Sequence, residues 1–135
     1  MKENLLKAIA NSRNYTLRTA ELMPLETYNT KLTDQNWNFG ELLSHVAYSI
    51  GWWTDNYVLV KETGWNPPTP NVDKLTIIVK LKEAFDQFEQ KIQEISLNPQ
   101  SLHGAYATLD HVTHHRGQCV LFLRQQGIKP PEYIY

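Results

Sequence analysis

The chain has 135 residues, about the length of one domain, and its 13 Lys and Arg residues are matched by 14 Asp and Glu residues. Its hydrophobic content of 41% and charged content of 20% exclude a disordered protein and an integral membrane protein. The net charge of −1 disfavours a dedicated nucleic-acid binder. A single cysteine, Cys119, excludes an intramolecular disulfide and a multi-cysteine zinc site, and is compatible with a reducing cytoplasm.

The N-terminal segment does not resemble an export signal, because Lys2, Glu3 and Lys7 interrupt its apolar residues. The most membrane-like stretch, residues 42–54, is shorter than the roughly 20 residues that a spanning helix needs. We therefore expect a single domain over residues 1–135 that is cytoplasmic and has neither a nucleic-acid nor a membrane partner.

The first two predicted helices lie in the N-terminal half. One is predicted over residues 3–22, although the polar residues 11–14 interrupt its apolar face. The other begins after Asn38, which can accept a hydrogen bond from the backbone of Glu41 while the Glu41 side chain reaches back. This arrangement is a capping box, and the apolar face that follows it includes His45.

The third and fourth predicted helices lie in the C-terminal half. The third has the clearest apolar face, formed by Ile78, Leu81, Phe85, Phe88, Ile92 and Ile95. The fourth is predicted over about residues 105–126, where Gly127 and the prolines beyond it end the helix, and His103 is expected in the preceding loop. Strand signals are nearly absent. The sequence therefore predicts an all-α fold, a four-helix bundle.

The spacing of the histidines in the fourth helix points to a metal site. His111 and His115 are four residues apart, which places both imidazoles on one helix face, one turn apart. His45 is a candidate third ligand from another helix, and three protein nitrogens would leave an open site of the catalytic kind. The alternatives are a hydrogen-bonded core histidine at His45 and pairing of His114 with His111, although we expect His114 to point outward.

Two sequence motifs contain these histidines. The segment over residues 110–118 is DHVTHHRGQ, and LFLRQQG follows it at 121–127. The segment over residues 37–45 is WNFGELLSH. In this order and at this distance, they resemble the H-x-x-x-H-R-G-Q and W-S-x-x-E-x-L-x-H motifs of the DinB/YfiT-like family, and the resemblance extends over nearly the whole chain.

The resemblance implies a DinB-like four-helix bundle that binds a divalent metal, zinc or nickel above all, through three histidines. By motif position these ligands are His45, His111 and His115. Characterised members of the broader superfamily are mycothiol- or bacillithiol-dependent transferases and isomerases. The resemblance therefore implies a small-molecule substrate and a low-molecular-weight thiol. It also implies a homodimer, whose interface can include Trp65, Tyr133 and Tyr135; the alternative for these residues is packing at the chain ends.

Three residues near the histidines are candidates for a substrate pocket. Tyr48 and Trp52 follow His45 by three and seven residues, and so can line the wall above the metal. The alternative for both is aromatic filling of the core. Arg116, next to His115, is a candidate to hold a substrate carboxylate, and the alternative is a surface or interhelical ion pair.

Three further residues of the fourth helix have separate expected roles. Gln118 lies seven residues after His111 on the same face, where it can orient a ligand histidine. Gly117 costs about 1 kcal/mol relative to alanine inside a helix, which hints at close helix packing. Cys119 is expected to be a buried structural thiol, and the alternative is a soft metal ligand.

The sequence leaves three functions open. The first is an enzyme, a metal-dependent transferase acting with a low-molecular-weight thiol, or a metal-dependent hydrolase. No Asp, Glu or Tyr has the spacing of an obvious general base, so a metal would supply most of the activation. The second function is a non-catalytic metal-binding, stress-associated module. The third is a plain helical protein with buried histidines and no metal.

Overall fold

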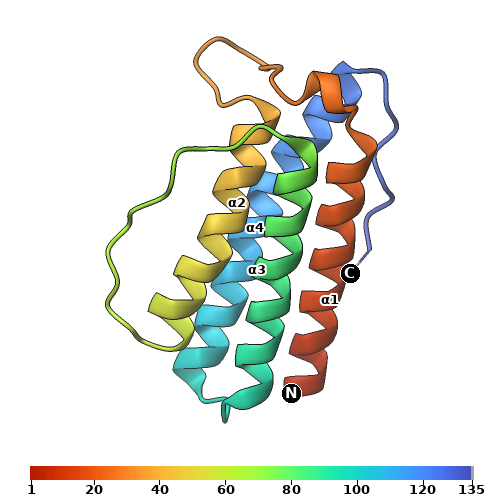
Figure 1. Cartoon of the computed structure of the whole chain (residues 1–135). Coiled ribbons are helices and arrows are strands. Elements are labelled where there is room, and N and C mark those ends of the chain that lie inside the picture. Colours follow the sequence, from red (N-terminus) through yellow and green to blue (C-terminus); the bar gives the residue numbers. More distant parts are fainter. Residues whose placement is uncertain (135) are drawn as a thin grey trace.

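The computed structural model describes residues 1–134 and forms a bundle of four long helices (Figure 1). They are α1 (Lys2–Leu22), α2 (Phe39–Trp53), α3 (Lys74–Glu94) and α4 (Pro99–Gln125). This part of the chain contains no β-strand, only an isolated bridge between Lys31 and Asn38. The predicted all-α four-helix bundle is therefore confirmed.

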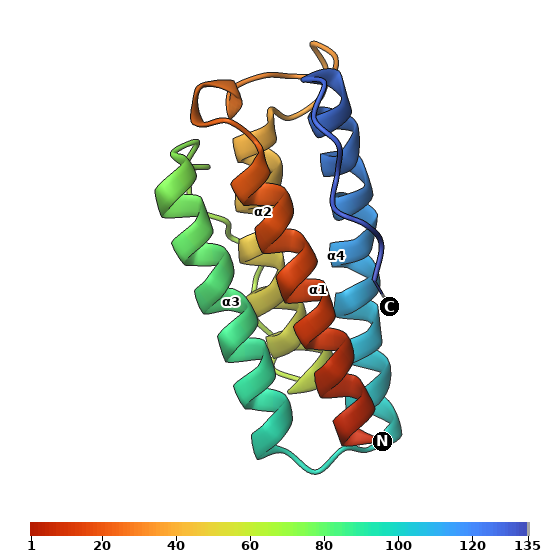
Figure 2. The ribbon, with the colours of Figure 1, turned by 90° about the vertical axis from the view of Figure 1, so that its right-hand side faces the viewer.

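The order of the helices explains one long connection. In Figure 1, α1 and α4 run in one direction, whereas α2 and α3 run in the other. Because α2 and α3 are parallel neighbours, the chain between them (residues 59–73) has to return along the whole length of the bundle. Each helix packs against two others, α1 on α3 and α4, and α2 on α3 and α4 (Figure 2). Residues of α3 and α4, which follow α2 at a distance in the sequence, therefore pack along α2.

Side-chain caps fix where three of the helices begin. The predicted capping box is present at α2, where Asn38 Oδ1 accepts from the backbone of Glu41 at 2.8 Å. Asp73 caps α3 through the backbone of Thr76. A second capping box, between Asn98 and Ser101, begins α4.

The predicted start of α4 was wrong, because the helix begins at Pro99 and includes His103. The signal for the earlier start is present in the sequence. Asn98 is a favourable N-cap residue, and Pro99 fits the first helical position, where its missing N–H costs nothing. The predicted end was correct, since Gly127 follows α4 with a φ of +73°, a left-handed conformation that glycine adopts without strain.

The core lies between the four helices and consists of aliphatic and aromatic side chains. The largest fully buried ones are Tyr28, Phe39, Phe85, Phe88, Phe122, Leu5, Ile9, Met23, Leu43, Ile50, Ile77 and Leu81. The buried face of α1 also includes Thr16 and Thr19, whose hydroxyls donate to carbonyls four residues earlier. These bonds satisfy the two buried hydroxyls within the helix itself.

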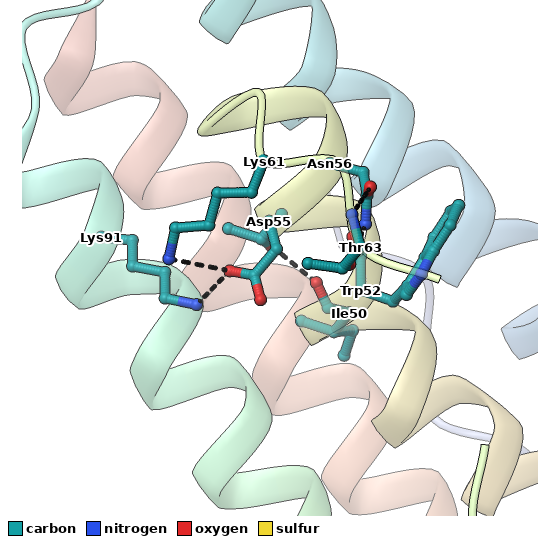
Figure 3. A network of polar contacts seen from close by, with 8 residues as sticks. Ile50, Trp52, Asp55, Asn56, Lys61, Thr63 and Lys91 are labelled. Carbon is teal, nitrogen blue, oxygen red and sulfur yellow. Dashed lines mark hydrogen bonds and ion pairs between the residues drawn. The ribbon is translucent and has the colours of Figure 1, made fainter. Parts of the chain in front are cut away.

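A π-helical turn, η2 (Thr54–Val58), extends α2 and starts the long connection. Figure 3 shows Lys61 and Lys91 reaching the Asp55 carboxylate from the connection and from α3, and the Lys91 pair measures 2.8 Å. On the other side of the turn, the Asn56 amide donates to the Thr63 hydroxyl and accepts from the Thr63 backbone. These contacts hold the connection against the end of α2.

The turn also packs tightly against α4 at Gly104. A Cβ atom at Gly104 would lie 2.0 Å from the backbone oxygen of Tyr57. The close approach that Gly117 suggested in the sequence therefore occurs at Gly104. A Cβ atom at Gly117 would meet nothing within 4 Å, so the interpretation of Gly117 as a packing residue was wrong.

Replacing Gly117 by alanine is expected to stabilise the protein by up to about 1 kcal/mol. The position is helical, exposed and open, so the variant gains helix propensity without a clash. Urea denaturation of the metal-free protein would measure the change in the free energy of unfolding. A loss of stability would show that the neighbourhood of Gly117 is more crowded than its open surroundings indicate.

The outer surface includes two of the residues named above for a dimer. Trp65 is half exposed and Tyr133 is largely exposed, whereas Tyr135 lies outside the described residues. No helix in residues 1–134 combines the length and the apolar character needed to cross a bilayer.

Candidate metal centre

The three histidines with the motif spacing converge in the structure. His45 comes from α2, and His111 and His115 come from successive turns of α4. The Nε2 atom of His115 lies 3.1 Å from Nε2 of His45 and 3.1 Å from Nε2 of His111. All three offer a ligand atom within 4.8 Å of one another. Two nitrogens on one tetrahedral zinc ion, at bond lengths near 2.0–2.1 Å, are about 3.3 Å apart. The cluster therefore has the dimensions of a single-ion site.

Gln118 fixes the orientation of one imidazole. Its side-chain oxygen lies 2.8 Å from Nδ1 of His115, so this nitrogen carries the proton and donates it. The lone pair of His115 is then on Nε2, the atom that faces the other two histidines. A hydrogen bond of this kind is typical behind metal-ligating histidines, because it selects the tautomer and holds the ring.

The local environment favours neutral imidazoles. Burial lowers the pKa of His45 to about 4, and the neighbouring His115 contributes to the shift. Burial also lowers the pKa of His111 to about 4, helped by His115, His45 and His114. The pKa of His115 is lowered by burial too, while its hydrogen bond to Gln118 opposes the shift. Three neutral imidazoles present the lone pairs that a metal ion requires.

The metal-free protein is expected to lose stability as the pH falls from about 6.5 towards about 4. The pKa values of His45 and His111 near 4 lie below the value of about 6.5 for an unfolded histidine, so the unfolded state binds more protons in this interval. The stability contributed by the two neutral imidazoles is fully present above about pH 6.5 and is lost as the pH falls through about 4. Between about pH 7 and pH 5 the loss amounts to about 2–4 kcal/mol of the free energy of unfolding.

Urea denaturation in the presence of a chelator, repeated across this pH range, would measure the loss. His111→Gln is expected to flatten the pH dependence, and His103→Gln, on the exposed part of α4, is expected to leave it unchanged. Equal slopes for all three proteins would contradict the assignment to the histidine cluster.

Tryptophans surround the cluster on several sides. Trp37 packs on His45 with a ring-centroid distance of 4.6 Å, and Trp65 lies 5.7 Å from the same ring. Trp53 stacks on His111 at 4.8 Å with an interplanar angle of 22°. Trp53 was not among the predicted site residues, although it lies eight residues after His45 and helical spacing puts both on one side of α2. Ser49, whose hydroxyl lies 3.3 Å from Nε2 of His45, was not predicted as a site residue either.

A pocket of about 1070 Å³ opens beside His45, between α2, α3 and the long connection. Tyr48 and Trp52, the two aromatic residues expected in a pocket, both line it. Their polar atoms also hold the connection in place. The Tyr48 hydroxyl accepts from the backbone of Asn66 at 2.9 Å, and Trp52 Nε1 donates to the carbonyl of Gly64 at 3.0 Å.

Arg116 is not brought to this pocket. It is 7% exposed, and its guanidinium lies 4.3 Å from the ring centroid of Tyr15 and 5.7 Å from that of Tyr133. The reason is helical geometry, since each step along α4 turns the side chain by about 100° and carries Arg116 away from the His115 face. A cation–π contact with Tyr15 takes the place of the expected substrate contact.

Cys119 and His114 are the two remaining residues of α4 that the sequence offered as alternative members of the site. Cys119 is a buried free thiol, as expected, and burial raises its pKa to about 12. His114 is exposed, as expected, although its ring lies 5.0 Å from that of His115. Among the described residues, the cluster with metal-site dimensions consists of His45, His111 and His115 without either of them.

Comparison with known proteins places the chain in a family. The family model described as the DinB family matches residues 1–103. The chain belongs to the DinB family. The matched range contains His45 of the candidate centre, while His111 and His115 lie beyond it. No protein of curated function shows significant similarity to the chain.

Solved structures of DinB-like proteins share the fold of this DinB family member. A DinB-like protein from Bacillus cereus ATCC 10987 superposes with a TM-score of 0.78 at 18% identity, covering 98% of this chain and 97% of that one. The DinB-like protein YjoA from Bacillus subtilis superposes with a TM-score of 0.75 at 15% identity, covering 96% of this chain and 97% of that one. At these identities the similarity concerns the fold.

The three histidines of this DinB protein can hold a metal ion. Their nitrogens converge at the spacing that one ion needs, and Gln118 holds His115 in the required tautomer. Imidazole is a ligand suited to zinc, copper, iron and nickel. The donor set therefore fits a divalent transition metal, and three ligands leave room for a small molecule to bind as well.

Proposed function

We propose that this DinB protein is a metal-dependent enzyme that transfers a low-molecular-weight thiol to an electrophilic small molecule. The observation that carries the proposal is the convergence of three Nε2 atoms beside a pocket that His45 also lines. A closed structural site would have four protein ligands, whereas three leave open positions. A divalent ion, zinc or nickel, would lower the pKa of a thiol bound to it and so favour the thiolate.

The residues around the histidine cluster would have separate parts in this function. His45, His111 and His115 would hold the ion, and Gln118 keeps His115 oriented through the 2.8 Å bond to Nδ1. Trp37 and Trp53 pack on the imidazoles of His45 and His111 and support their positions. Tyr48 and Trp52 line the pocket where the electrophile would bind. Metal-dependent hydrolysis is the related alternative, with water in place of the thiol.

A transfer assay on the metal-loaded protein tests this function. With an aryl chloride as electrophile, the thiol sulfur bonds to the ring carbon, chloride leaves with its electron pair, and the thiol proton goes to solvent. We expect turnover with zinc or nickel that is lost in His115→Asn, while His103→Asn retains it. A panel of cysteine-derived thiols would identify the preferred one.

Two results would contradict the proposal. If the protein binds a stoichiometric metal ion but transfers no thiol, and hydrolyses no ester or amide in a parallel screen, the site belongs to a non-catalytic metal-binding module. If His115→Asn unfolds together with the loss of metal, the ion has a structural role. Circular dichroism of the metal-free parent and variant separates these cases, because a catalytic site leaves both folded.

We further infer a homodimer that acts in the cytoplasm, in line with the family resemblance of the sequence. The largely exposed Tyr133 is the interface candidate, because the Trp65 ring lines the pocket. Light scattering of the parent beside Tyr133→Ala would measure the mass. A monomeric parent would contradict the dimer and would leave the metal site untouched.

A further inference from the structure

We infer that the pocket between α2, α3 and the long connection binds a planar aromatic compound that is neutral or singly positive, next to the three histidines. As a statement about the substrate, this inference rests on the proposed function. As a statement about binding, it rests on the pocket itself, which can be tested without metal.

The shape of the pocket favours an elongated small molecule. Its lining follows α2 and the start of η2 from Glu41 to Asp55, a distance of about 20 Å at 1.5 Å per residue. The volume of about 1070 Å³ is at the upper end of small-molecule sites. His45 lines the pocket near one end, so a ligand lying in it can bring one atom to the histidine cluster.

Aromatic rings supply the walls of the pocket. Trp65 makes edge contacts with Tyr48 at 4.9 Å and with Trp52 at 5.2 Å, so these rings form one rigid wall. Trp37 lines the same pocket and packs on His45. Trp37 and Trp65 are each 46% exposed. Large rings left half exposed around a pocket are the surface that a flat apolar ligand would cover.

The roof of the pocket is held in place before any ligand binds. Ser44 Oγ donates to the carbonyl of Asn71 at 2.7 Å, in addition to the bonds from Tyr48 and Trp52 to the same connection. Pro67, Pro68 and Pro70 restrict the backbone between these attachment points. A pre-formed roof reduces the entropy lost on binding, so the pocket can bind a small ligand without reorganisation.

The charges on the walls decide between cationic and anionic ligands. The lining contains the carboxylates of Glu41, Asp55 and Glu83 and the ammonium group of Lys80. Lys91 and Lys61 offset Asp55 from outside the lining, which leaves two carboxylates against one lysine. This balance disfavours an anionic ligand, and aromatic faces beside carboxylates favour a cation.

Four related compounds test the inference on the full-length chain, both as purified and after metal removal with a chelator. They are 1-naphthylmethylammonium, 1-naphthalenemethanol, 1-naphthoate and cyclohexylmethylammonium. Calorimetry would give affinities, and the indole N–H signals in NMR spectra would report which tryptophans are contacted. In the metal-free protein, where no ion can bind the carboxylate, we expect the first two to bind at least tenfold more tightly than the anion and the saturated compound, with the signals of Trp37 and Trp65 shifting.

Variants assign the binding to the pocket. Trp65→Ala is expected to weaken naphthyl binding at least tenfold, and Trp65→Phe is expected to stay within about threefold of the parent. Tyr106→Ala is the matched control, because Tyr106 has a similar exposure of 43% and does not line the pocket. Glu83→Gln is expected to reduce the preference for the ammonium compound over the naphthoate.

Several results would overturn the inference. They are, in the metal-free protein, tighter binding of the naphthoate, equal binding of the cyclohexyl compound, or unchanged affinity in Trp65→Ala. Metal content, measured on the same preparations, separates this inference from the proposed function. Naphthyl binding by a protein that takes up no metal would refute the proposed function and leave the pocket assignment standing. Metal uptake without naphthyl binding would refute the pocket assignment and leave the proposed function standing.

Discussion

Replacing His111 or His115 by alanine is expected to lower the affinity of the protein for zinc or nickel by at least 100-fold. Loss of a hydrogen bond behind a ligand histidine alone typically costs about 10- to 100-fold, and these substitutions remove a ligand itself. The parent should bind about one divalent ion per chain. At a metal concentration of about 100 times the parent's Kd, binding stabilises the parent by about 2.7 kcal/mol, and a variant that binds about 100-fold more weakly keeps only about 0.4 kcal/mol of this gain.

Calorimetric titration and metal analysis after purification without an affinity tag would measure the effect. His103→Ala and His114→Ala are the controls, since both residues are exposed on α4 and lie outside the converging cluster. Both should bind the ion as the parent does. A parent that remains free of metal after zinc or nickel is added back would refute the site, and the three histidines would then be hydrogen-bonded residues of the core.

Replacing Gly104 by alanine is expected to cost about 3 kcal/mol or more of the free energy of unfolding. The new Cβ atom would lie 2.0 Å from the backbone oxygen of Tyr57 and 2.4 Å from its carbonyl carbon. Because both atoms belong to the backbone of η2, no side-chain rotation can relieve the clash, and the turn must move away from α4. Urea denaturation beside Gly117→Ala, which places a methyl group in open space on the same helix, would measure the difference.

The same substitution is expected to disturb the candidate metal centre. Gly104 lies seven residues, about two turns, before His111, and η2 directly follows Trp53, whose ring stacks on His111. Displacement of the turn should therefore change the Trp53 fluorescence and weaken metal binding in the molecules that still fold. A variant as stable as the parent would show that η2 can move away from α4 at little cost.

The sequence by itself determined the helices, two of the candidate ligands and one of the caps. Helical periodicity and capping depend on residues three or four positions apart, so the local sequence contains them. The capping box at Asn38, the end of α4 at Gly127 and the shared face of His111 and His115 all follow from such spacings. The start of α4 was also encoded locally, in the Asn98 cap, but was not recognised.

The tertiary structure determined which residues of different helices and of the long connection are in contact. His45 meets His115 across 70 positions of sequence, and the residues that line the pocket come from α2, α3 and the connection between them. Helical spacing leaves open which face of a helix meets a neighbour. For this reason the sequence suggested a substrate contact for Arg116, whereas in the structure its guanidinium lies over the ring of Tyr15. Likewise, close packing was predicted at Gly117 and is found at Gly104. Contacts between helices depend on how the apolar faces of all four pack together, and that is settled only when the whole bundle forms.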